Sequence, residues 1–183
     1  MQPEVQGHGV TPGAIIVMGV SGSGKSTLGE LLADALGCPF IEGDALHDPA
    51  SIEKMRAGHP LGDEDRWPWL DRLGKALHDA TAAHGVAVAA CSALKFRYRE
   101  RLTRAIAGPT SFILLETDRA ELARRIGSRT GHYMPASLLE SQLATLERPH
   151  EGEQALILDA NLPPEILCRA SRDWLMRDAP PPS

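Results

Sequence analysis

The chain has few cysteines, no long apolar run and no excess of basic residues. Its cysteines are odd in number and far apart, which argues against a disulfide framework and favours buried, reduced thiols; they are Cys38, Cys91 and Cys168. No run approaches the roughly 20 apolar residues that span a bilayer. The first 13 residues lack the basic and apolar regions of a signal peptide. We therefore expect a cytoplasmic protein with no membrane partner.

The charge balance argues against another class of partner. Lys and Arg number 19 against 24 Asp and Glu, so the 183-residue chain has a net charge of −5. General nucleic-acid binders carry a strongly basic footprint, and we expect no nucleic-acid partner here. A local basic pocket for a small anion is compatible with this balance. The histidines and cysteines show no zinc-ligand spacing.

Short apolar runs alternate with longer segments of helical period, which predicts an α/β protein with a mostly parallel sheet. Strands are expected at 14–18, 39–41, 86–91, 110–115 and 155–158. Helices are expected at 26–36, 49–58, 65–85, 95–107, 118–129, 137–147 and 163–176. The polar, Pro- and Gly-rich ends at 1–13 and 179–183 are interpreted as flexible tails around one domain at 14–178.

The block Gly19–Ser26 matches the phosphate-loop pattern G-x-x-x-x-G-K-[ST] in full, with a predicted strand before it and a predicted helix after it. Glycines let successive N–H groups point at phosphate oxygens, and the helix N-terminus adds partial positive charge. Lys25 is expected to reach the β- and γ-phosphates, and the Ser26 hydroxyl to ligate Mg²⁺. The predicted nucleotide contacts are Gly19, Val20, Ser21, Gly22, Ser23, Gly24, Lys25, Ser26 and Thr27.

The rest of the chain narrows the class of nucleotide-binding protein. The guanine-reading Asn-Lys-x-Asp segment of GTPases is absent. A motor or transporter ATPase would present an acidic pair after an inner strand. Glu116, which follows the predicted strand at 110–115, keeps that alternative open.

Two carboxylates, Glu42 and Asp44, follow the short second strand. At i and i+2 of an extended segment they would point to the same side, and at the carboxyl end of a strand they would line the ligand crevice. One could then hold a water of the Mg²⁺ shell while the other accepts a proton from a hydroxyl. A helix cap or a solvated turn is the alternative.

Several further blocks resemble the signatures of the gluconokinases. In chain order they are EGDALH at 42–47, KMRAGHPL at 54–61, DRWPWL at 65–70, CSALK at 91–95 with YR at 98–99, GHYM at 131–134 and SQ at 141–142. The resemblance implies the P-loop kinase fold of shikimate and nucleoside monophosphate kinases. This fold is a three-layer α/β sandwich whose five-stranded parallel sheet has the order 2-3-1-4-5, with a helical lid at about 118–147. It also implies phosphorylation of D-gluconate at its 6-hydroxyl by ATP with Mg²⁺, and relatives that often form homodimers.

The resemblance also implies roles for individual residues. Asp44 would bind and deprotonate the 6-hydroxyl, and Glu42 would contact Mg²⁺ through water. Because the substrate is a polyhydroxy carboxylate, its pocket needs a cation, and Arg66 is the candidate; an ion pair with Asp63 or Asp65 is the alternative. The other predicted substrate contacts, each with a structural or surface role as its alternative, are His47, Ser92, Lys95, Arg99 and His132.

Arg125 and Arg129 lie four residues apart on one predicted helix, with Arg124 beside them. Like charges at this spacing repel, so the cluster favours a site where an anion is present part of the time. In the resembling kinases these arginines close over the transferred phosphoryl group, and both are therefore candidate catalytic residues with Asp44 and Lys25. The alternative is a solvated face in which Glu121 pairs with Arg125.

Two other functions stay open at this stage. A kinase for another small hydroxy acid or a nucleoside monophosphate would share the fold, but the blocks at 65–70 and 91–95 argue against it. A non-catalytic nucleotide-binding regulator would not need Lys25, Ser26 and Asp44 together.

Overall fold

The computed structural model describes residues 11–128 and 135–177. Five parallel strands form one sheet in the order β2-β3-β1-β4-β5. They are β1 (Gly13–Met18), β2 (Phe40–Glu42), β3 (Val86–Ala90), β4 (Thr110–Glu116) and β5 (Ala155–Asp159). The predicted fold class and strand order are confirmed.

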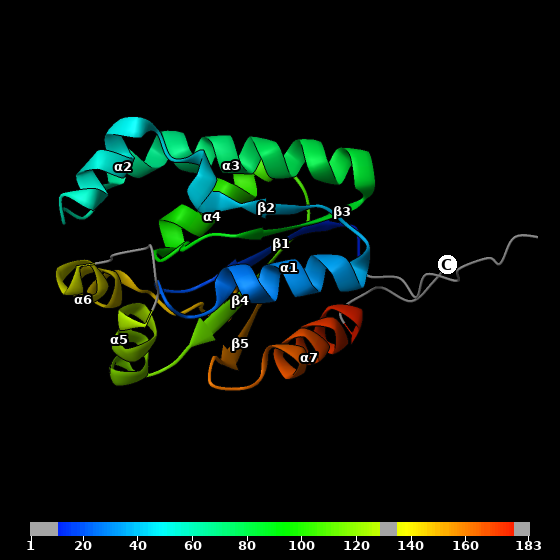
Figure 1. Cartoon of the computed structure of the whole chain (residues 1–183). Helices are drawn as coiled ribbons and strands as arrows, with labels where there is room; N and C mark the ends of the chain where they lie inside the picture. Colours follow the sequence, from blue (N-terminus) through cyan, green and yellow to red (C-terminus); the bar gives the residue numbers. More distant parts are fainter. Residues whose placement is uncertain (1–10, 129–134, 178–183) are drawn as a thin grey trace, which may run out of the picture.

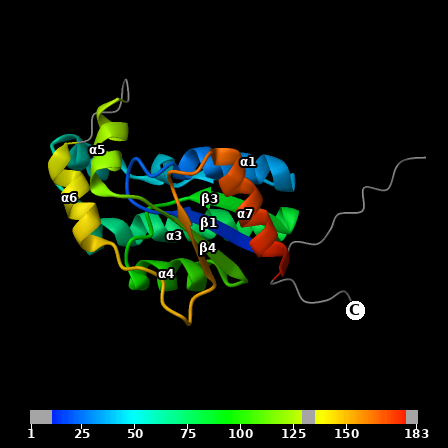
Figure 2. The ribbon, with the colours of Figure 1, turned by 90° about the horizontal axis from the view of Figure 1, so that it is seen from below.

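Helices cover both faces of the sheet (Figures 1 and 2). One face carries α3 (Asp63–His84) and α4 (Phe96–Ile106), and the other carries α1 (Lys25–Leu36) and α7 (Pro164–Arg177). The shorter helices gather at one end of the molecule; they are α2 (Pro49–Arg56), α5 (Arg119–Gly127) and α6 (Ala136–Thr145). No helix of the described segments is long and apolar enough to cross a membrane.

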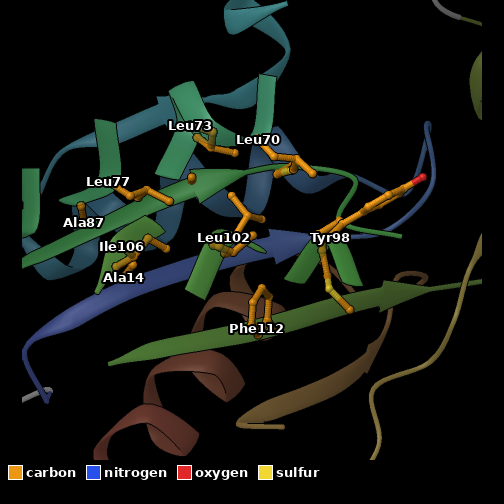
Figure 3. Close-up of a cluster of buried hydrophobic side chains, with 14 of the residues drawn as sticks. Ala14, Leu70, Leu73, Leu77, Ala87, Tyr98, Leu102, Ile106 and Phe112 are labelled. Carbon is orange, nitrogen blue, oxygen red and sulfur yellow. The ribbon is translucent and has the colours of Figure 1, made fainter. Parts of the chain in front are cut away.

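The central strand β1 is buried on both faces, which explains why its sequence does not alternate. Ile16 and Met18 pack toward α3 and α4, whereas Ile15 and Val17 pack toward α1 and α7. Figure 3 shows the first of these cores, with leucines of α3 above the strands and side chains of α4 and β4 around them. Two hydrophobic cores thus hold the sheet in place, and the loops at its carboxyl end are built on it.

The predicted boundaries differ from the observed ones by one or two residues. β1 begins at Gly13, inside the predicted tail, because this residue already pairs with Val86 of β3. α3 begins at Asp63, two residues before the predicted start. The lid limits of about 118–147 and the domain limits of 14–178 stay predictions, and the tail at 179–183 lies outside the described residues.

The prediction that Asp44 lies on an extended segment is wrong. Only Glu42 belongs to β2, and Asp44 lies in the 3-10 turn η1 (Gly43–Leu46). The chain turns here directly against β3, since a Cβ on Gly43 would lie 2.3 Å from the carbonyl oxygen of Ala90. The two carboxylates are therefore presented by different backbone conformations.

Candidate active site

The phosphate loop connects β1 to α1 in the conformation that its glycines allow. Gly22 and Gly24 have φ angles of 83° and 97°, which side-chain-bearing residues rarely adopt. Gly19 has φ 142°, and a Cβ there would lie 2.7 Å from the carbonyl oxygen of Leu115. Gly24 is the N-cap of α1 and offers no capping side chain, so the start of the helix is left open to an anion. The Ser23 hydroxyl is buried and has no partner in the described part of the chain.

The loop and its neighbours also provide a cation and two oxygen ligands. Lys25 Nζ donates to the carbonyl of Val20 at 3.1 Å, so the ammonium lies over the loop. Ser26 Oγ donates to Glu42 Oε2 at 2.5 Å. A hydroxyl beside a carboxylate is a donor set that suits Mg²⁺.

A pocket of about 390 Å³, here called the Asp44 pocket, opens beside the loop. It brings together six of the predicted site residues, which are Ser21, Lys25, Asp44, His47, Arg66 and Ser92. Ser92 also accepts a hydrogen bond from the Gly19 amide through its carbonyl, at 3.3 Å, which ties the end of β3 to the start of the loop. The volume lies within the range of small-molecule sites.

Asp44 and His47 face this pocket in different ways. The Asp44 side chain is 75% exposed, whereas that of His47 is 6% exposed and stacks on Trp69 with ring centroids 4.1 Å apart. His47 Nε2 lies 3.9 Å from Asp44 Oδ1. Burial lowers the pKa of His47 more than Asp44 raises it, which favours the neutral imidazole.

Arg66 is a buried cation in the wall of the Asp44 pocket. Arg66 is 8% exposed, and its Nε donates to the carbonyl of Leu61 at 3.3 Å. The guanidinium carbon lies 5.4 Å from the centre of the Tyr98 ring. The alternative of an ion pair with a neighbouring aspartate is wrong: Asp63 pairs with Lys95 and Arg97, and Asp65 pairs with Lys54.

The structure does not bring Lys95 and Arg99 to the pocket. Lys95 Nζ lies 3.3 Å from Asp63 Oδ1. Arg99 is 1% exposed and donates two hydrogen bonds to Glu153, at 2.5 and 2.8 Å, and others to the carbonyls of Ala93 and Glu147 at 3.1 Å. The Arg99 guanidinium is thus already hydrogen-bonded to Glu153 and to backbone carbonyls, and we withdraw Arg99 as a substrate contact.

Arg125 lines a second pocket of about 490 Å³, here called the Asn161 pocket, on the other side of the loop. Its Nη2 donates to the carbonyl of Ala160 at 2.8 Å. Hydrogen bonds from Arg124 and Arg125 lower the pKa of Glu121 to about 2, so the alternative pairing is present and the charge cluster does not by itself require an anion. Arg129 and His132 lie outside the described residues.

Known proteins that are similar to this chain show which family it belongs to. Residues 15–149 match a family model described as an AAA domain. The chain is 48% identical over 159 residues to a gluconokinase of Gluconobacter oxydans, covering 87% of this chain and 89% of the relative. The chain belongs to the gluconokinase family. A crystal structure of a Sinorhizobium meliloti gluconokinase is 47% identical, covers 91% of this chain and 93% of that one, and has a TM-score of 0.82. A sugar kinase structure from a Janibacter species is 43% identical with a TM-score of 0.83, and covers 90% and 94%.

Two polar lining residues of the Asp44 pocket were not among the predicted site residues of this gluconokinase-family chain. Gln142, from α6, accepts a hydrogen bond from the Ser21 amide at 2.8 Å. Arg56 lies at the end of α2 and pairs with Glu53 at 2.8 Å. Both fall inside blocks that carry the family resemblance, and this was the available signal.

Proposed function

We propose that this chain transfers the terminal phosphoryl group of ATP to the 6-hydroxyl of D-gluconate, giving 6-phospho-D-gluconate and ADP. One observation supports this most strongly: Lys25 of the phosphate loop and Asp44 line the same pocket as the buried guanidinium of Arg66, which has no carboxylate partner among the described residues. The names of the similar proteins support the same substrate. They do not favour a kinase for another hydroxy acid or a nucleotide, or a non-catalytic regulator.

The loop lies between two pockets and gives the nucleotide a direction. Gly22, Gly24 and Thr27 line the Asn161 pocket, whereas Ser21 and Lys25 line the Asp44 pocket. We assign the nucleoside to the Asn161 pocket, between Arg125 and the loop after β5, and the terminal phosphate to the Asp44 side. In this assignment Arg125 contacts the nucleotide, and its predicted closure over the transferred group would need a movement of α5.

Ser26 and Glu42 would hold Mg²⁺, directly or through water, because their oxygens already lie together. When bound, the ion would neutralise charge on the β- and γ-phosphates. The chain's own contribution on this side is Lys25, whose ammonium would move from the Val20 carbonyl to the phosphates.

At the acceptor end, Asp44 accepts the proton of the gluconate 6-hydroxyl. The hydroxyl oxygen forms a bond to the γ-phosphorus while the bond between that phosphorus and the β–γ bridging oxygen breaks, and ADP leaves. Arg66 binds the carboxylate of gluconate, and neutral His47 and Ser92 contact its hydroxyls. The catalytic role of Arg129 and the substrate contact of His132 stay predictions, as do the homodimer and the cytoplasmic location.

A coupled assay of ADP release, run with gluconate, shikimate and nucleoside monophosphates, tests the proposal. We expect turnover that depends on gluconate. Turnover only with shikimate or a nucleotide would replace the substrate, and ATP binding without turnover would replace the activity.

A further inference from the structure

The indole of Trp69 contacts both ends of the turn that carries Asp44. Trp69 Nε1 donates to the carbonyl of Gly43 at 2.7 Å, directly before Asp44. The same side chain stacks on His47, three residues after Asp44, with an interplanar angle of 18°. Asp44 therefore lies between two contacts made by a single residue of α3.

The position of the Asp44 carboxylate depends on this backbone. Its side chain is 75% exposed, so packing around the side chain does little to place it. Gly43 fixes the other side of the turn, because it lies directly against the Ala90 carbonyl of β3. Trp69 is 1% exposed and does not line the Asp44 pocket. It touches the turn from the core, where it cannot meet the substrate.

We propose that Trp69 is a positioning residue that acts on phosphoryl transfer through Asp44, by fixing the turn Gly43–Leu46. The inference rests on the proposed role of Asp44 as the base. A displacement of about 1 Å at a reacting group can cost about 100-fold in rate. The loss of the indole hydrogen bond should therefore lower kcat and leave the KM for ATP unchanged.

The test is a double-mutant cycle between position 69 and Asp44. Trp69→Phe keeps an aromatic ring against His47 and removes the N–H donor. Benzothienylalanine at position 69 removes the same donor with sulfur in place of N–H and preserves the indole shape, so it serves if the Phe variant does not fold. Trp67→Phe is the matched control, because the ring contacts of Trp67 among the described residues are with Tyr98, Arg97 and Arg101.

Single-turnover phosphorylation of gluconate, with enzyme in excess and followed for hours, measures even the slow variants. We expect removal of the donor to lower the rate about 10-fold or more in the wild-type background and less than about 2-fold in the Asp44→Asn background. Equal losses in both backgrounds, or no loss with Asp44 present, would overturn the positioning role. A near-normal rate for Asp44→Asn alone would instead overturn the proposed base.

Discussion

Gln142 and Ser21 are hydrogen-bonded across 121 positions of sequence, with the side-chain oxygen of Gln142 accepting from the Ser21 amide at 2.8 Å. This bond docks α6 on the phosphate loop. It also places an uncharged acceptor beside the space that we assign to the terminal phosphate.

Substitutions at Gln142 should separate docking from charge. Gln142→Leu removes the acceptor and should speed hydrogen exchange at the Ser21 amide. Gln142→Glu keeps an acceptor but adds a carboxylate near the phosphates, so we expect it to raise the KM for ATP more than Gln142→Leu does. Steady-state kinetics at saturating gluconate measure this difference. A similar KM for the two variants would show that the side chain lies away from the bound phosphates.

Asp44→Asn removes the proposed base and keeps the shape of the side chain. We expect kcat to fall by about 10²- to 10⁴-fold, as is typical for loss of general-base catalysis, while the KM for ATP stays nearly unchanged. Asp79→Asn is the control, because Asp79 is exposed on α3 and pairs only with Lys75 at 2.6 Å among the described residues. Comparable turnover in Asp44→Asn and Asp79→Asn would remove Asp44 as the base.

Arg66→Met removes the cation that we assign to the gluconate carboxylate. Hydrogen bonds to charged groups contribute roughly 1.5–3 kcal/mol, so the KM for gluconate should rise about 10- to 100-fold. The KM for ATP is the internal control and should change little. The variant should also discriminate less between gluconate and uncharged glucitol. If that discrimination is retained, the carboxylate binds elsewhere.

Arg99→Met breaks a buried ion pair and leaves Glu153, 7% exposed, without its cation. The free energy of unfolding should fall by about 3–5 kcal/mol in urea titrations. The double variant with Glu153→Met should recover part of the loss. Arg101→Met is the matched control, because it breaks a similar two-bond pair with Asp71 that is exposed, and it should cost less than about 1 kcal/mol.

His47 should make the protein less stable in mild acid. Burial lowers its pKa below the ordinary value of 6.5; Asp44 and Asp48 oppose this shift, and Arg66 and Arg72 add to it. Below pH 6.5 the unfolded chain therefore binds a proton that the folded chain does not, and stability falls as the pH drops toward the folded pKa. Unfolding titrations at several pH values should show a shallower slope for His47→Phe. His84→Gln, an exposed site at the end of α3, is the control, and an unchanged slope in His47→Phe would contradict the shift.

Sequence reasoning recovered the features that are encoded locally. The glycines and lysine of the phosphate loop are adjacent in the chain, and their pattern predicted both its conformation and its place between a strand and a helix. The strand order came from the family resemblance. The family resemblance also pointed to Arg66 as a cation of the substrate pocket; Arg66 lines the Asp44 pocket, and its contact with the substrate stays a prediction.

The errors arose where distant residues decide the outcome. Lys95 and Arg99 look like one basic helix face, yet Glu153 lies 54 residues beyond Arg99 and captures its guanidinium. Nothing near Glu42 shows that Gly43 must lie against the Ala90 carbonyl, which converts an extended segment into a turn. Trp69 resembles any buried aromatic until its contacts with Gly43 and His47 are known.

The two pockets have no lining residue in common within 11–128 and 135–177, although Ser21 and Ile126 line one pocket and their chain neighbours Gly22 and Arg125 line the other. In the proposed assignment, the sugar acid and the nucleoside would thus be recognised by separate sets of residues. Substitutions in the Asp44 pocket, by evolution or by design, could then change the acceptor substrate while the pocket proposed for the nucleotide stays unchanged.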